Sequence, residues 1–74
     1  MEMDKLKPWE DKVAELRLAD GEWMRAKVAF VYFEYQDVIV NILETNQPER
    51  YSVDWAQSGI VILAEEILEI SNPS

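Results

Sequence analysis

The residues of this chain that could do chemistry are aromatic rings, carboxylates and a few cations. His and Cys are both absent, and no Gly-rich phosphate loop is present. A nucleophile and its base would have to come from Ser, Lys or carboxylates alone. A domain this small has little room for a deep pocket that would shift the pKa values of those carboxylates. Without His and Cys the chain lacks the two commonest zinc ligands, and no carboxylate spacing resembles a calcium loop. The sequence predicts a protein that is not an enzyme and that holds no cofactor and no metal.

Aromatic side chains are the best candidates for a binding surface. The segment VYFEY, residues 31–35, carries four apolar or aromatic residues in five positions, which is more than a solvated loop needs. Aromatic rings stack on nucleic-acid bases or enclose a cation. The candidate binding residues are Trp23, Arg25, Tyr32, Tyr35 and Trp55. The alternatives are that part of VYFEY belongs to the core and that Trp23 covers a neighbouring subunit or an N-terminal helix.

Acidic side chains outnumber basic ones by 15 to 7, which gives a net charge of -8. Because nucleic-acid binding draws its affinity from cations that displace phosphate counterions, DNA and RNA are disfavoured partners, although a local basic patch stays open. The simplest interpretation of the charge is a solubilising surface. The alternative is an acidic face formed by Glu65, Glu66 and Glu69. An acidic decoy that occupies a partner's nucleic-acid site would use these three together with Glu44, Glu49 and Asp54.

Length and composition predict one small domain over residues 1–74. The chain is 74 residues long and 49% of it is apolar, so it should fold, although it is close to the smallest size that buries an adequate core. No disulfide can form, and stability must come from packing within the chain or between copies. No apolar run approaches the roughly 20 residues that span a bilayer, and the N-terminus lacks the apolar segment of a signal peptide. We expect a cytoplasmic protein that does not enter a membrane.

Periodicity predicts the elements. Leu6, Trp9 and Val13 are spaced as on a short helix, and Pro8 suits a first turn, so residues 1–12 form a helical or extended arm with a helix from about residue 7 to 14. The segment AELRLADG alternates and ends in an Asp-Gly turn, which predicts a strand that opens a hairpin. In the strand that follows, one face is predicted to point into the core: Met24, Ala26, Val28 and Phe30.

Three further stretches predict strands. DVIVNIL, residues 37–43, is almost continuously apolar, as expected of a strand that is covered on both faces or lies at an interface. RYSVDW, residues 50–55, alternates again. In GIVILAEEILEI a helical face is also possible, but Gly59 and the β-branched run after it favour strands.

These elements predict a mainly β fold, a small five-stranded barrel with a short N-terminal helix, because closure removes exposed sheet edges. The chain resembles the first motif of Sm-like proteins at Gly21, Ala26 and Val28. Tyr32 and Gln36 stand where that family has the Asp and Asn of its RNA-base pocket, and the family's Arg-Gly pair is missing. The resemblance thus implies an SH3-like barrel more than RNA binding.

A second resemblance is to Tudor-type domains, carried by DGEWMRAKV. It implies an aromatic cage for a methylated Lys or Arg, although that family's later aromatic, Asp and Gly cluster is missing. Its rings would come from Trp23, Tyr32, Phe33, Tyr35, Tyr51 and Trp55, and its carboxylate from Glu34 or Asp37.

The function that we expect from the sequence is that of a non-enzymatic interaction module. It would self-associate into a homo-oligomer through edge strands, as Sm-like barrels do when they form rings. The candidate interface residues are Val38, Val40, Ile42, Ile60 and Ile62. The alternatives are a binder of RNA or of a modified peptide through the aromatic residues, and the acidic decoy.

Overall fold

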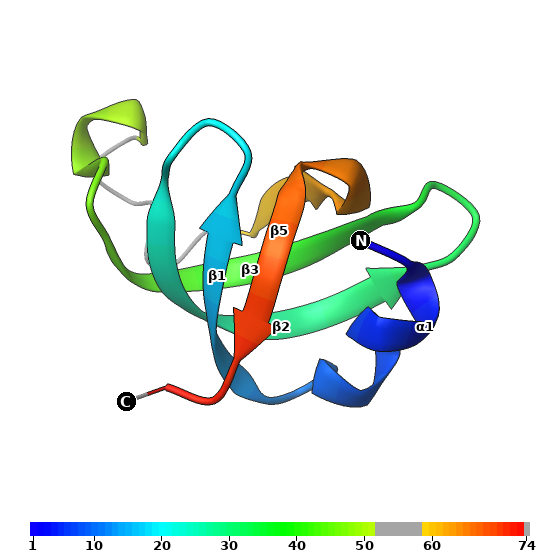
Figure 1. Cartoon of the computed structure of the whole chain (residues 1–74). Coiled ribbons are helices and arrows are strands. Elements are labelled where there is room, and N and C mark those ends of the chain that lie inside the picture. The colour runs from blue at the N-terminus through cyan, green and yellow to red at the C-terminus, as the bar shows by residue number, and fades with distance from the viewer. Residues whose placement is uncertain (52–58, 74) are drawn as a thin grey trace.

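The fold is mainly β, with five antiparallel strands in one sheet and a short N-terminal helix. The computed structural model describes residues 1–51 and 59–73. The strands are β1 (Val13–Leu18), β2 (Trp23–Tyr32), β3 (Asp37–Thr45), β4 (Ile60–Leu63) and β5 (Ile67–Ser71). The helix is α1 (Met3–Leu6), and the 3-10 turns are η1 (Lys7–Trp9), η2 (Pro48–Arg50) and η3 (Ala64–Glu66). The strand order is β4-β3-β2-β1-β5. In Figure 1, β2 and β3 curve so that β1 and β5 pass across the front of β3, which gives the sheet a barrel-like form.

The N-terminal helix lies before Pro8 and not after it, so the predicted helix over residues 7–14 is wrong. Proline has no N–H to continue an α-helical hydrogen-bond ladder, and α1 gives way to the 3-10 turn η1 at Lys7. Leu6 is buried and Trp9 packs against the core, whereas Val13 already belongs to β1. The arm therefore covers one end of the core through Leu6 and Trp9, without Val13.

The predicted hairpin between β1 and β2 is confirmed. Gly21 has a φ of 93°, a left-handed conformation that glycine adopts without steric cost. The amide of Gly21 donates to the carbonyl of Leu18, and the amide of Leu18 donates to the carbonyl of Glu22. The turn therefore depends on the Asp-Gly pair, as the sequence indicated.

The core is formed by the inward faces of all five strands, by Leu6 of α1 and by Ala64 of η3. Its buried apolar residues are Leu6, Ala14, Leu16, Leu18, Met24, Ala26, Val28, Val31, Val38, Val40, Ile42, Ile62, Ala64 and Ile67. Alternation is regular in β1 and over the first half of β3, so β3 is buried on one face and not on both. The near-continuous apolar run of DVIVNIL therefore supplies a core face and a partly exposed outer face.

Phe30 is not in the core, contrary to the sequence prediction. Val28 pairs with Val40 and Phe30 with Ile39, so β2 has one more residue than β3 at this point. Such a β-bulge reverses the alternation beyond it. Phe30 is consequently 53% exposed and Val31 takes the inward position.

Two further register shifts turn leucines outward. Beside Arg25 the extra residue on β3 is Leu43, and beside Arg17 the extra residue on β5 is Leu68. Leu43 is 48% exposed and Leu68 is 62% exposed. Together with Phe30 they account for three of the large apolar side chains on the surface.

The last part of the chain is extended, as predicted, and η3 divides it into β4 and β5. The predicted strand over residues 50–55 begins with Arg50, which belongs to η2, and residues 52–55 lie outside the described part of the chain. Within the described ranges, no helix has the length and apolar character needed to cross a lipid bilayer.

Candidate functional site

The outer face of the sheet is divided into a charged half and an apolar half. In the charged half, Arg17 lies opposite Trp23 and Glu69, and its Nε is 3.5 Å from the Glu69 carboxylate. Arg25 lies opposite Glu15, and one of its terminal nitrogens is 3.5 Å from the carboxylate of Glu44. Both arginines are therefore already engaged by carboxylates of the same chain.

The apolar half lies over β2, β3 and β4. Strand register places Phe30, Ile39 and Val61 in one row across the three strands, and Tyr32, Asp37 and Leu63 in the next. The rings of Phe30 and Tyr32 stack at 5.8 Å, and Tyr35 meets Tyr32 edge to face at 6.3 Å. We call this surface the aromatic face, made of Phe30, Tyr32, Tyr35, Ile39, Val61 and Leu63.

The aromatic face is open to solvent. Tyr35 is 69% exposed and Val61 is 58% exposed. The bulge in β2 brings Phe30 onto this face, and the turn after Tyr32, where Gln36 has a positive φ of 52°, brings Tyr35 back beside Tyr32. An exposed, contiguous set of large apolar side chains marks an interaction surface.

Three carboxylates border the aromatic face. Asp37 lies in register between Tyr32 and Leu63 and is half-buried. Glu65 lines a small hollow of about 150 Å³ with Tyr35, Gln36 and Leu63, and Glu34 precedes Tyr35 in the turn. Among residues 1–51 and 59–73, none of these three carboxylates has an ion pair or a side-chain hydrogen bond.

The structure separates the predicted binding residues. Tyr32 and Tyr35 lie on the aromatic face, whereas Trp23 and Arg25 lie in the charged half, with Trp23 and Tyr32 at opposite ends of β2. Trp55 lies outside the described residues. Of the further proposed cage rings, Tyr51 packs against the core and its hydroxyl bonds to Glu22. The aromatic face instead includes Phe30, Ile39, Val61 and Leu63, which the sequence did not single out for binding.

The side chains predicted to form an oligomer interface lie mostly in the chain's own core. Val38, Val40, Ile42 and Ile62 are each at most 4% exposed, because they occupy the inward positions of β3 and β4. Ile60 is partly buried and packs against the same core. The outward residues of these strands, Ile39, Val61 and Leu63, are the ones that another molecule can reach.

The three glutamates of the predicted acidic face have different surroundings. Glu65 and Glu66 are exposed in η3, and Glu65 borders the aromatic face. Glu69 is in β5 and pairs with Arg17 in the charged half. Of the decoy residues, Glu44 pairs with Arg25, Glu49 is exposed in η2, and Asp54 lies outside the described residues.

A buried carboxylate, Glu22, was missed by the sequence reasoning. Its residue is 2% exposed. The Thr45 hydroxyl donates to it at 2.5 Å, the Tyr51 hydroxyl lies 2.8 Å from both of its oxygens, and Arg50 donates from 3.3 Å. Glu22 stands two residues before Met24, and side chains two residues apart along a strand point to the same face. The alternating pattern of β2 therefore indicated that Glu22 would point inward.

Asp20 extends this network to the surface. Its carboxylate accepts from Arg50 and from the amide of Glu22. The hydrogen bond from Arg50, and then that from the Glu22 amide, lower the pKa of Asp20. Burial first, and then the hydrogen bond to the Glu22 carboxylate, raise the pKa of Tyr51. The hydrogen bonds of Glu22 and Asp20 join the turn between β1 and β2 to Thr45, Arg50 and Tyr51. We call this network the latch.

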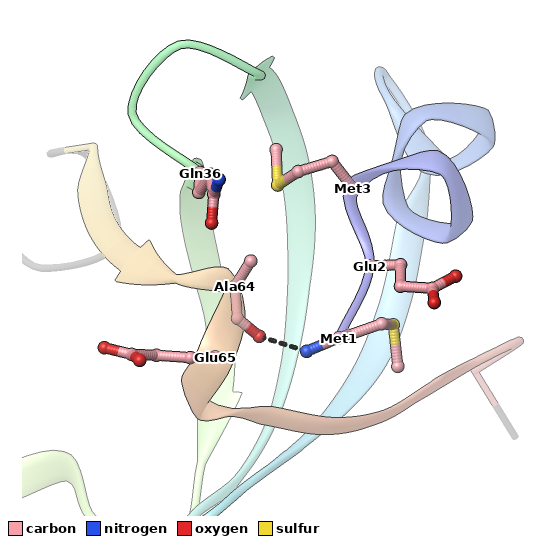
Figure 2. Close-up of a pocket in the computed structure, with 6 residues that line it drawn as sticks. All are labelled: Met1, Glu2, Met3, Gln36, Ala64 and Glu65. Atoms are coloured by element: carbon pink, nitrogen blue, oxygen red, sulfur yellow. Dashed lines mark hydrogen bonds between the residues drawn. The ribbon is translucent and has the colours of Figure 1, made fainter.

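A hollow of about 500 Å³ lies beside the N-terminus, but its polar groups do not converge. Figure 2 shows Met3 and Gln36 on facing walls, while the carboxylates of Glu2 and Glu65 point away to either side. The Met1 amine donates to the carbonyl of Ala64 at 2.6 Å. In the described part of the chain, no group of three or more His, Cys, Asp or Glu side chains is arranged to hold a metal ion.

Comparisons with protein-family models, with curated proteins and with solved structures find no match to this chain.

Proposed function

We propose that this protein is a non-enzymatic interaction module that binds another protein segment through its aromatic face. The observation that carries the proposal is the contiguous exposure of Phe30, Tyr35 and Val61, at 53%, 69% and 58%. Burying apolar side chains of this size contributes about 1.5 to 3 kcal/mol each in favourable cases. Protein interfaces combine such an aromatic centre with a polar rim, as the carboxylates around this face provide.

The surroundings of the aromatic face support a protein partner over a nucleic acid. Asp37 lies between Tyr32 and Leu63 in register, where a phosphate would meet a negative charge. The cations Arg17 and Arg25 of the same sheet face already pair with Glu69 and Glu44. Base stacking on the aromatic face would therefore have few cations close by to hold a nucleic-acid backbone.

The family relationship that we propose is with small barrels of the Sm-like or SH3-like kind. A single curved antiparallel sheet of five strands and a short N-terminal helix support it. A Tudor-type cage is supported less, since Trp23 and Tyr32 are at opposite ends of β2. We propose a cytoplasmic location for the same interaction module.

Self-association through an edge strand is the second candidate function. β4 ends the sheet, and among the described residues no strand pairs with its other edge. Residues 60–63 are Ile-Val-Ile-Leu, without a charge that would oppose pairing between copies.

The proposed function is tested by affinity capture with matched surface variants. Phe30→Ser/Tyr35→Ser removes two rings of the aromatic face, and Leu68→Ser removes an equally exposed apolar side chain on β5. We expect the wild type and Leu68→Ser to retain the same protein partners, and the double variant to lose them. Thermal unfolding of all three proteins checks that each is folded. Equal retention by all three proteins would place the binding surface elsewhere.

A further inference from the structure

We infer that the occupant of the aromatic face is an extended segment of another protein that carries Lys or Arg between apolar side chains, and not a second copy of this chain. This inference rests on the proposed function and specifies the partner. It follows from the charges around the face and from the position of β4 at the sheet edge.

The charges on the aromatic face are unbalanced. Asp37, Glu34 and Glu65 have no side-chain partner among the described residues, and Asp37 is half-buried between Tyr32 and Leu63. The neighbouring row of the sheet contributes one cation, Lys27, opposite Asn41. A partner that supplies cations would neutralise carboxylates that this chain leaves unpaired.

A second copy supplies the wrong charges. If two copies met through their aromatic faces, each copy would contribute three carboxylates, Glu34, Asp37 and Glu65, and one cation, Lys27. Both chains would also bring a net charge of -8. Like charges facing each other across an interface oppose association, so apolar contact would have to overcome repulsion in a homodimer but not in a complex with a basic segment.

The rings provide a second reason for a cationic partner. Tyr32 contacts both Phe30 and Tyr35, and the three residues are 39%, 53% and 69% exposed in that order. The face of an aromatic ring attracts Lys and Arg within about 6 Å of its centre. With Asp37 and Glu65 beside these rings, a guanidinium or ammonium would meet both a carboxylate and a π-surface.

The sheet edge indicates an extended partner. The rows that end at Val61 and Leu63 stop at β4, whose outer edge has no strand partner among the described residues. A strand added there would continue both rows, and its alternate side chains would all face the same side as Val61 and Leu63. Apolar residues would extend the first row, and a cation would extend the row that contains Asp37.

The test uses two short synthetic peptides and the full chain. In one peptide, every second residue is in turn Val, Lys, Tyr and Lys, with Ser at the positions between them, so that apolar and cationic side chains share one face of the extended strand. In the matched peptide Glu replaces Lys. We expect the Lys peptide to shift the backbone amide resonances of β4 and of the outer positions around Phe30 and Tyr35, and the Glu peptide to leave them unchanged.

Charge-reversed variants give the test its specificity. Asp37→Lys should weaken binding of the Lys peptide by about tenfold, while Glu49→Lys, an equal change of charge in η2, should leave it unaltered. Glu65→Lys serves the same purpose at an exposed site, so that the test still decides if Asp37→Lys does not fold.

Four results would overturn the inference. Equal binding of both peptides, shifts that map to the charged half, or tighter binding of a single-stranded oligonucleotide to the same face would each exclude a cationic peptide as the occupant. Concentration-dependent dimerisation through the aromatic face without peptide binding would also overturn it, while leaving the proposed interaction module intact. If capture of partners is insensitive to Phe30→Ser/Tyr35→Ser, the proposed function itself fails.

Discussion

At the scale of single residues, Glu22 and the side chains around it connect parts of the chain that are distant in sequence. The carboxylate accepts from Thr45, Tyr51 and Arg50. A buried carboxylate is costly unless it is hydrogen-bonded, and removing it leaves the donors without an acceptor. Conserving the shape while removing the charge therefore tests how much the latch stabilises the fold.

We predict that Glu22→Gln lowers the free energy of unfolding by about 1 to 3 kcal/mol, because an amide accepts less strongly and places an N–H where acceptors are needed. Urea denaturation followed by tryptophan fluorescence measures this change. The control Glu49→Gln, at an exposed residue of η2, should change it by less than about 0.5 kcal/mol. Equal effects of the two substitutions would show that the latch contributes nothing.

We predict that stability falls as the pH is lowered below about 4.5, the ordinary pKa of Glu10. The hydrogen bond from Lys7 and then that from the amide of Val31 lower the pKa of Glu10 in the folded protein, and Arg50 lowers that of Asp20 from 3.8. A carboxyl group whose pKa is lower in the folded protein than in the unfolded chain stabilises the fold at any pH above its unfolded-state pKa. This stabilisation is lost as the pH falls through the folded-state pKa.

Melting temperatures between about pH 7 and pH 3 measure the loss. The variant Glu10→Gln/Asp20→Asn cannot lose these interactions by protonation, so its melting temperature should depend less on pH over the acid range. An identical dependence in the wild type and the variant would contradict the assignment to these two carboxylates.

At the scale of elements, β-bulges decide which apolar residues reach the surface. Strict alternation correctly predicted the inward positions of Met24, Ala26 and Val28. It failed at Phe30, because the extra residue in β2 is set by the pairing with β3 and has no signature in the β2 sequence alone. The helix was misplaced for a related reason, since Pro8 is compatible with the 3-10 turn after α1 as well as with the start of a helix.

The position of the bulge is tested by two truncations. Val31→Ala should lower the free energy of unfolding by about 2 kcal/mol, as for other truncations of buried aliphatic side chains. Phe30→Ala removes a much larger side chain, yet it should lower that free energy by less than about 1 kcal/mol, because the side chain is exposed and its main contact is the stacked ring of Tyr32. The opposite order in chemical denaturation would mean that Phe30 is inward and that β2 has no bulge.

The aromatic face was only partly predictable for the same structural reason. Tyr32 and Tyr35 were identified from the density of rings in VYFEY. Ile39, Val61 and Leu63 join them through the pairing of β2, β3 and β4, which are distant in sequence. Trp23 was grouped with Tyr32 among the candidate binding residues, whereas β2 places the two at opposite ends of the strand.

At the scale of the whole molecule, the net charge of -8 distinguishes the two modes of association by their salt dependence. Salt screens exposed charges, with a Debye length of about 8 Å at physiological ionic strength. Raising the salt concentration should weaken binding of the Lys peptide, because salt screens the attraction between opposite charges. It should strengthen any self-association, because salt screens the repulsion between two acidic chains. Titrations and light scattering in low and high salt measure the two effects, and a common direction for both would contradict this account.

The latch also affects the rate at which the protein unfolds. Its hydrogen bonds join residues separated by 23 to 30 positions, and such contacts require a long loop to close before they form. We expect the β1–β2 hairpin to form early and the contacts of Glu22 with Thr45 and Tyr51 to form after the folding transition state. Glu22→Gln should then accelerate unfolding and leave the refolding rate nearly unchanged in stopped-flow experiments. A buried carboxylate in this position would make the folded chain long-lived without making it quick to fold.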